Sequence, residues 1–312
     1  MKLRIGTRGS KLALAYTNQA IQSLDCETEI VIVKTPGDED QVTPIYEMGG
    51  KGVFCSTIEQ ELLKNNIDVA VHSLKDMPGE ETEGLTITAM LKRNSPYDVM
   101  VGSVKMNCII GTSSPRRKAQ LLDLYKSLDI QIKPIRGNID TRLEKLDNGE
   151  YDAIILAEAG LKALDIRRTT LRIPIIPAVG QGIIALQTRS DDTSVIDIVK
   201  KANHKKTYAQ GQVERAFLKG IGGDCHTKIA GHATGTNPIS LRQCIMIEDD
   251  THDMLTKAYM EYFKANDAFE ARNSVRTHGS ARKWLREIRS LAKLRMDEIH
   301  EKHKTKKDQG KE

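Results

Sequence analysis

Short β-rich runs alternate with helical patterns through the first two-thirds of the chain, and this alternation constrains the fold more than any other feature. In the first unit, strands are predicted at 3–7, 29–34, 67–72 and 85–90. Helices are predicted after Ser10, a residue type typical of helix N-caps, and at 57–64. Strands and helices in this order predict an α/β fold with mainly parallel strand pairing.

A second unit repeats the pattern, with strands predicted at 98–101, 108–111, 131–135 and 153–156. Helices are predicted between them near 115–127 and 138–147. A later strand, 183–187, follows Pro177 and has no unit of its own. We expect this strand to return to the sheet of the first unit, so that two crossings join two lobes. A cleft between lobes is a favoured place for a ligand.

The chain changes character at about residue 203. A helix is predicted at 207–218, and a Gly-rich turn follows at 220–225. Shorter β-like segments come next near 228–234, 239–247 and 254–260, and a further helix is predicted at 281–302. This pattern predicts a small α+β third domain. The predicted domains are 1–91 with 182–200, then 97–176, and finally 203–312.

Composition limits the classes of function. The 312 residues include 47 Lys and Arg against 42 Asp and Glu, and only 4% are aromatic. A nucleic-acid binder more often has clustered basic charge interleaved with aromatics, and the basic stretch 282–311 also carries acidic residues. Five widely spaced cysteines imply no disulfide framework. We therefore expect a cytoplasmic protein without nucleic-acid partners, a secretion signal or a membrane span.

Four turns share one design: an apolar run leads into a turn rich in Gly, Ser or Thr that also carries Arg or Lys. These turns are 6–10, 49–52, 111–117 and 136–138. The N–H groups at a helix start and a nearby guanidinium both favour anions. No Walker or Rossmann motif is present in the sequence. An arginine after a single turn is usually only solvated, but four such turns predict a cleft lined by Arg and Lys that holds a small, carboxylate-rich molecule.

The segment 69–78 is unusual because a buried strand ends in Ser73, Lys75 and Asp76 before a proline stops it. Asp76 and Lys75 could form a plain surface pair, worth about 0–1 kcal/mol. A carboxylate at the exit of a strand into a cleft could instead stabilise a cationic intermediate or accept a proton. His72 is expected to be a core histidine and not part of the site.

Cys225 lies in the Gly-rich turn beside Asp224 and His226. It could be a small apolar side chain in a tight turn, or an accessible thiol for covalent attachment. A zinc site of Cys225 with His226, His232 and Cys244 has unsuitable spacing, so no metal is predicted.

Taken in order, these segments resemble the porphobilinogen deaminase family, also called the hydroxymethylbilane synthases. The resemblance runs from about residue 3 to about residue 231. Its strongest motifs are Ile5-Gly6-Thr7-Arg8 with Ser10, the segments 49–54 and 71–78, Gly111-Thr112-Ser113-Ser114 with Arg116-Arg117, Arg136-Gly137-Asn138 with Thr141-Arg142-Leu143, and the segments 145–153 and 177–182.

The resemblance implies a monomer of three domains, in which the first two lobes are like periplasmic binding proteins. It implies a dipyrromethane cofactor, made from the substrate and held by a thioether at Cys225. The implied reaction condenses four molecules of porphobilinogen, releases ammonia each time, and ends with hydrolysis to hydroxymethylbilane in tetrapyrrole (heme) biosynthesis. This is a transferase activity with a small-molecule substrate.

The resemblance also assigns roles to residues, and Asp76 matches the catalytic aspartate. The matches to carboxylate-binding arginines are Arg8, Arg116, Arg117, Arg136 and Arg142. The matches to other cofactor or substrate contacts are Lys75, Ser10, Ser73, Thr112 and Ser114. Lys51 and Phe54 match a mobile loop over the cleft. Each added pyrrole brings two carboxylates, so a growing chain needs many cations.

The chain departs from the family pattern at several places. Pro115 replaces a common Leu, Tyr16 replaces a frequent Gln, and no proline follows Cys225 closely. A further cleft arginine is expected near 167–168, where Arg167 and Arg168 both stay candidates. Beyond residue 235 the resemblance is weak. A rival hypothesis is a non-catalytic anion-binding or sensor module on the same two-lobed fold, which would give no reason for Cys225.

Overall fold

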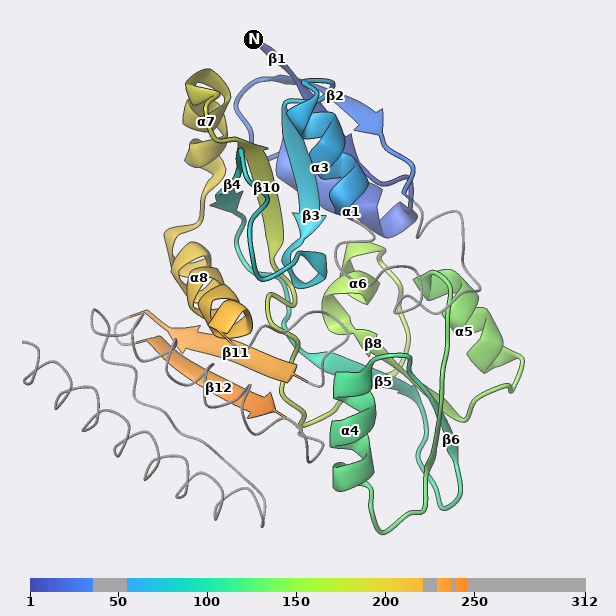
Figure 1. Cartoon of the computed structure of the whole chain (residues 1–312). Coiled ribbons are helices and arrows are strands. Elements are labelled where there is room, and N and C mark those ends of the chain that lie inside the picture. The colour runs from blue at the N-terminus through green and yellow to red at the C-terminus, as the bar shows by residue number, and fades with distance from the viewer. Residues whose placement is uncertain (36–54, 221–228, 237–238, 246–312) are drawn as a thin grey trace, which may run out of the picture.

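The computed structural model describes residues 1–35, 55–220, 229–236 and 239–245. These residues form two lobes, each built on a five-stranded sheet, and a smaller unit in which one helix packs on a β-hairpin. Figure 1 shows the first lobe above the second, with the smaller unit beside both. The α/β class predicted from the alternating pattern is therefore confirmed.

The first lobe contains a mixed sheet of order β2-β1-β3-β10-β4. Its strands are β1 (Lys2–Thr7), β2 (Glu27–Ile32), β3 (Val69–Ser73), β4 (Leu85–Met90) and β10 (Ile184–Arg189). Strand β1 pairs in parallel with β2 and β3, whereas β10 is antiparallel to both β3 and β4. The prediction that the late strand returns to this sheet is confirmed.

Successive side chains along the central strands point to opposite faces of the sheet, and helices pack on both faces. Leu3, Val69 and Val71 belong to a cluster on one face, where they pack with residues of α1 (Lys11–Ile21) and α7 (Thr193–Val199). Ala70 points to the opposite face and packs with α3 (Ser56–Leu63). Because helices cover both faces, the inner strand β3 is buried along almost its whole length, as the sequence pattern indicated.

The second lobe has a sheet of order β7-β6-β8-β5-β9. Its strands are β5 (Asp98–Gly102), β6 (Ile109–Gly111), β7 (Gln131–Lys133), β8 (Ala153–Ala157) and β9 (Thr170–Arg172). One face packs on α4 (Pro115–Leu124) through Leu121. The other face packs on α5 (Ile139–Asp147) and α6 (Glu158–Ala163) through Leu143 and Leu161.

The expectation of mainly parallel pairing is wrong, because each sheet has two parallel and two antiparallel pairings. The physical reason is that the chain passes between the lobes twice, first through residues 91–97 and then through residues 173–183, which we call the two crossings. Strand β5 enters the second sheet from one crossing and runs antiparallel to β8 and β9. Strand β10 re-enters the first sheet from the other crossing, between β3 and β4.

The two crossings contact each other so closely that the position of Gly182 requires glycine. Gly182 has φ +81°, and a Cβ atom there would lie 2.6 Å from the Ser95 carbonyl oxygen and 2.8 Å from that of Asn94. The Asn94 amide donates to the Gly182 carbonyl at 2.7 Å. A side chain at Gly182 would therefore push the crossings apart.

A buried carboxylate from the third unit ties both crossings together. This unit consists of α8 (Lys205–Gly220) packed on the hairpin of β11 (Ile229–Gly235) and β12 (Ile239–Ile245). Glu214 of α8 accepts hydrogen bonds from Arg93 Nη1 at 2.6 Å and from the Gly180 amide at 2.6 Å. It also accepts from the Ala233 amide of β11 at 2.7 Å. One side chain thus joins three segments that lie far apart in the sequence.

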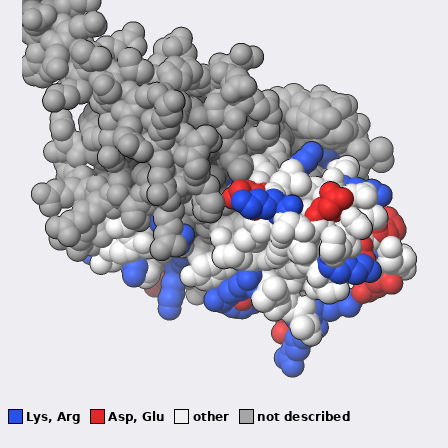
Figure 2. Space-filling model, turned by 90° about the horizontal axis from the view of Figure 1, so that it is seen from below, with Lys and Arg blue, Asp and Glu red and all other residues white. Residues whose placement is uncertain are grey.

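Most elements agree with the predicted ranges, but two short α-helices, one short strand and the 3-10 turns Leu74–Asp76 and Lys200–Ala202 were missed. Helices α6 and α7 and strand β9 had no predicted counterpart. The predicted segments 254–260 and 281–302 lie outside the described residues. Among the described helices, none is long and apolar enough to cross a membrane. Acidic and basic side chains intermingle on the described surface that is visible in Figure 2.

Candidate functional site

A cavity of about 330 Å³ lies between the two lobes. The first lobe contributes the start of α1 and the end of β3, and the second contributes the starts of α5 and α6. Basic side chains dominate the charged part of its lining, and Asp76 and Asp140 are the acidic residues there. The basic residues are Arg8, Lys11, Lys75, Arg117, Arg136 and Arg142. The predicted cleft lined by arginine and lysine is therefore present.

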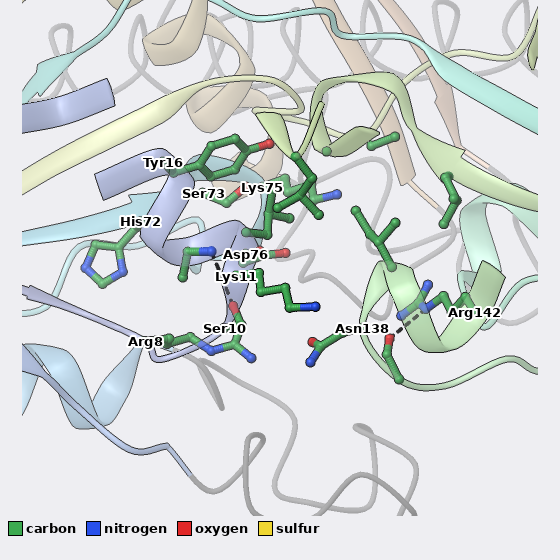
Figure 3. Close-up of a pocket in the computed structure, with 18 of the residues that line it drawn as sticks. Arg8, Ser10, Lys11, Tyr16, His72, Ser73, Lys75, Asp76, Asn138 and Arg142 are labelled. Carbon is green, nitrogen blue, oxygen red and sulfur yellow. Dashed lines mark hydrogen bonds between the residues drawn. The ribbon is translucent and has the colours of Figure 1, made fainter. Parts of the chain in front are cut away.

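The N-terminal turn of α1 positions the first group of site residues. Ser10 is the N-cap, and its Oγ accepts from the Ala13 amide at 3.3 Å, as its residue type predicted. Arg8 precedes this cap and is half-buried in the cavity wall. Figure 3 shows the side chains of Arg8 and Lys11 extending across the cavity toward Asn138.

The end of β3 supplies Ser73, Lys75 and Asp76 to the cavity. A short 3-10 turn over Leu74–Asp76 begins where the Leu74 amide donates to the Ile183 carbonyl at 2.9 Å. Gly180 lies against this turn, since a Cβ atom there would lie 2.9 Å from the Lys75 amide nitrogen. The turn is therefore held from behind by the second crossing while its polar side chains face the cavity.

Lys75 is the least solvated lysine of the cavity. Burial lowers the pKa of its ammonium, and the charge of Arg117 lowers it further against the opposing effect of Asp76. Among the described residues, its ammonium has no hydrogen-bond partner. A cation in this environment would gain from an anionic ligand, which would offset the cost of its desolvation.

The start of α5 contributes a cluster of like charges. Arg142 Nε donates to the Gly137 carbonyl at 2.8 Å, which fixes its side chain beside the turn 136–138. Burial, followed by the charges of Arg117 and Arg136, lowers the pKa of Arg142 to about 10. The three guanidinium groups repel one another, so an anion placed among them would relieve that repulsion.

Arg116 and Arg117 share a buried counter-ion that the sequence analysis missed. Arg117 donates to Asp98 Oδ1 through Nη2 at 2.7 Å and through Nε at 3.0 Å. Arg116 Nη2 lies 2.8 Å from Asp98 Oδ2. Although burial opposes it, the charges of Arg117 and Arg116 hold the pKa of Asp98 below its usual range. Arg117 also faces the cavity, whereas Arg116 does not line it and donates to the Ile176 carbonyl at 2.7 Å.

Two of the predicted contacts support the α4 turn and do not line the cavity. Ser114 is the N-cap of α4, and its Oγ accepts from the Arg117 amide at 3.4 Å. Thr112 Oγ1 accepts from the Ser114 amide at 3.2 Å. In this structure both hydroxyls shape the turn that presents Arg117.

The remaining candidates fall into three groups. Cys225, Lys51 and Phe54 lie outside the described residues. Neither Arg167 nor Arg168 lines the cavity, and Arg168 pairs with Asp147 on the surface. Tyr16, at a position where the family often has Gln, lines the cavity, and burial raises the pKa of its phenol to about 12.

The histidine predictions can be compared with the described residues. His72 Nε2 lies 3.1 Å from Gln187 Oε1, and burial lowers the pKa of the imidazole. His72 borders the cavity, but its hydrogen bond and burial are those expected of a core histidine. No group of potential metal ligands occurs among the described residues, which exclude His226 and the side chain of Cys244.

Two family models match this chain, one in its N-terminal two-thirds and one nearer its C-terminus. The family model described as "Porphobilinogen deaminase, dipyromethane cofactor binding domain" matches residues 3–197. The model described as "Porphobilinogen deaminase, C-terminal domain" matches residues 209–277. Together they extend the resemblance past residue 235, where the sequence analysis found it weak.

Curated relatives carry the same name. The porphobilinogen deaminase of Ehrlichia canis is 40% identical over 284 residues, which cover 86% of this chain and 95% of that protein. A probable porphobilinogen deaminase of Hyperthermus butylicus is 44% identical over 250 residues, covering 75% and 82%. Among solved structures, the periplasmic VFT2 domain of BvgS from Bordetella pertussis aligns at 13% identity with a TM-score of 0.38, covering 69% and 90%. The fold assignment rests on the topology described above.

Proposed function

The chain belongs to the porphobilinogen deaminase family, and we propose that it condenses four porphobilinogen molecules onto a dipyrromethane primer, releases ammonia at each step, and hydrolyses the product to hydroxymethylbilane. The observation that carries this proposal is the cavity itself, in which Asp76 lies among basic side chains from both lobes. This would make the chain a transferase of tetrapyrrole biosynthesis.

The residues of the cavity fit the dipyrromethane cofactor of this family. Such a group carries several carboxylates and pyrrole N–H donors. Arg8, Arg136 and Arg142 come from both walls and offer guanidinium groups for carboxylates, and Lys75 adds an ammonium. Asp76 offers an acceptor for the N–H groups. When bound, the cofactor would supply the pyrrole carbon that accepts the first substrate.

We propose that Asp76 is the catalytic residue. Loss of ammonia from porphobilinogen leaves a positive charge on the substrate, and a carboxylate fixed at the end of β3 would stabilise it. Its position follows from the backbone, because the 3-10 turn is held by the contact with Gly180. Asp76 could also accept and return the protons that the condensation moves.

We propose that the basic residues of the cavity bind different parts of the ligand, according to their positions in the cavity. Arg8, Arg136 and Arg142 would bind acetate and propionate side chains, and Lys75 with Ser10 and Ser73 would hold the primer. Arg117 would contribute to primer binding while Asp98 fixes its orientation. Thr112, Ser114 and Arg116 would act through the shape of the α4 turn.

Several further parts of the proposal rest on family membership. Cys225 would carry the primer through a thioether, and Lys51 and Phe54 would belong to a loop over the cleft. We also propose the domain division 1–91 with 182–200, 97–176 and 203–312. The protein would act as a cytoplasmic monomer on a small molecule.

The activity assay follows porphobilinogen consumption and ammonia release by the purified protein. The expected result is loss of four porphobilinogen molecules for each hydroxymethylbilane formed. Asp76→Asn, which keeps the side-chain volume but removes the charge, is expected to abolish turnover. A protein that binds porphobilinogen without consuming it would instead be an anion-binding module, and the proposed activity would be refuted.

A further inference from the structure

One ion pair bridges the two lobes at the wall of the cavity. Lys11 Nζ donates to Asp140 Oδ2 at 2.7 Å, and both residues line the cavity. Lys11 belongs to the first lobe and Asp140 to the second, 129 positions apart in the sequence. The lobes also touch beside this pair, since a Cβ atom on Gly160 of α6 would lie 3.7 Å from Leu12 of α1. The pair therefore sits where the lobes meet, in the wall of the cavity.

The two partners differ in how well the local backbone accommodates their charges. Lys11 is the first residue of α1, where the positive end of the helix dipole disfavours a cation, and the first turn of α1 contains no acidic residue. Asp140 lies in the first turn of α5, where the dipole favours a carboxylate. Lys11 lowers the pKa of Asp140 most, and the backbone amides of Asp140 and Thr141 also lower it. Asp140 thus has other stabilising groups nearby.

The ion pair is exposed enough to exchange partners. The side chain of Lys11 is 78% exposed and that of Asp140 is 45% exposed. Pairs of this kind are weak because water and salt screen them. The remaining basic groups of the cavity, such as Arg8 and Lys75, face the same space as Lys11 (Figure 3). A carboxylate that approached them would compete directly with Asp140 for the ammonium.

We propose that Lys11 is a further substrate-binding residue, and that its ammonium leaves Asp140 to bind a carboxylate of the pyrrole substrate or of the growing chain. Asp140 is then a competing partner that pairs with the Lys11 ammonium whenever no substrate carboxylate does. This inference rests on the proposed function and adds a specific residue to it. It predicts opposite effects for the two partners: removing the charge of Lys11 weakens substrate binding, whereas removing that of Asp140 strengthens it.

A simple clasp between the lobes would behave differently. If the pair only held the lobes together, Lys11→Gln and Asp140→Asn would break the same bond and shift kinetic constants in the same direction. The sign of the Asp140→Asn effect therefore separates a substrate-binding lysine from a structural clasp.

The experiment measures KM and kcat for porphobilinogen with the full chain as purified, in wild type, Lys11→Gln, Asp140→Asn and the double variant. From the usual size of exposed charge interactions, we expect Lys11→Gln to raise KM by about two- to fivefold and Asp140→Asn to lower it by a similar factor. In the double variant, KM should match that of Lys11→Gln, because the benefit of removing Asp140 requires the lysine. Higher salt should reduce each difference.

A second ion pair provides the control for net charge. Lys2 Nζ lies 2.8 Å from Glu29 Oε2 on the first sheet, and neither residue lines the cavity. Lys2→Gln and Glu29→Gln make the same charge changes and should leave KM unchanged. Circular dichroism on every variant checks that the fold is retained.

Each outcome decides the matter. Opposite shifts in KM in the two single variants, together with a KM in the double variant equal to that of Lys11→Gln, support the assignment. An unchanged KM in Lys11→Gln, or shifts of the same sign in both single variants, would overturn the assignment of Lys11. The proposed function would still stand in that case, because the wild type would be active. A wild-type protein that consumed no porphobilinogen would overturn the proposed function, and the Lys11 assignment with it.

Discussion

Replacing Arg93 by Leu removes the cation that neutralises the most buried carboxylate of the third unit. Glu214 has no exposed side-chain surface, and the side chain of Arg93 is only 9% exposed. Two of the hydrogen bonds to Glu214, at 2.6 and 3.2 Å, come from Arg93, and a third bond from Arg93 reaches the Gln181 carbonyl at 3.0 Å. Leaving such a carboxylate unpaired is expected to cost about 3–5 kcal/mol in the free energy of unfolding.

The loss should depend on pH in a defined direction. Burial raises the pKa of Glu214 above its usual value even though Arg93 opposes this, and removal of Arg93 should raise it further. A carboxyl whose pKa is higher in the folded than in the unfolded state favours folding below its unfolded pKa, and this contribution is lost as pH rises through the folded pKa. The destabilisation of Arg93→Leu should therefore be smaller at about pH 5 than at about pH 7.5.

Equilibrium urea unfolding, followed by circular dichroism at both pH values, measures this effect. The matched variant is Arg93→Leu with Glu214→Gln, which removes the unpaired charge and keeps an acceptor oxygen for one of the two backbone amides, those of Gly180 and Ala233, that donate to the separate carboxylate oxygens. The double variant should be more stable than Arg93→Leu alone at neutral pH. A loss below about 1 kcal/mol, or one that does not change with pH, would refute the reasoning.

Three further variants test other parts of the structure. Asp76→Ala should keep the thermal midpoint near that of wild type but lose nearly all porphobilinogen turnover, and normal turnover would remove Asp76 from its proposed role. Asp98→Asn leaves two buried guanidinium groups without a counter-charge, so a loss of about 3–5 kcal/mol is expected in urea unfolding, and an unchanged midpoint would contradict the ion-pair assignment. Gly182→Ala places a Cβ atom at positive φ and 2.6 Å from the Ser95 carbonyl oxygen, so the thermal midpoint should fall by several degrees, whereas Gly149→Ala, with φ +77° but nothing within 4 Å, should cost less.

The parts of the fold that sequence reasoning predicted are those fixed by local pattern. The strand at 85–90 is found at the predicted residues, and Ser10 caps its helix. Short elements such as α6 and β9 were missed, because six and three residues carry too little periodicity to distinguish them from loops. The antiparallel direction of β10 was also missed, since it depends on the path of both crossings.

The residues of the site likewise fall into those that local sequence pattern predicted and those that it missed. Residues next to a recognisable turn, such as Arg8 and Arg136, were predicted as cavity residues and line it. Asp98 was missed because it begins an apolar strand and its partners come from a helix 18 to 19 positions later. A carboxylate at the start of a buried strand is itself a signal, because such a group requires a cation. The Lys11–Asp140 pair carries no such signal, since only the packing of the lobes brings its partners together.

The central claim is that this cavity holds a carboxylate-rich pyrrole primer attached to the protein, and intact-mass measurement tests it most directly. Wild type purified without denaturation should exceed the mass of its sequence by one dipyrromethane, and Cys225→Ala should lose that increment. The other cysteines provide the control, and Cys26→Ala should keep the adduct because Cys26 is partly buried and packs against the core of the first lobe. Wild type at the bare sequence mass, with no consumption of porphobilinogen, would contradict the account.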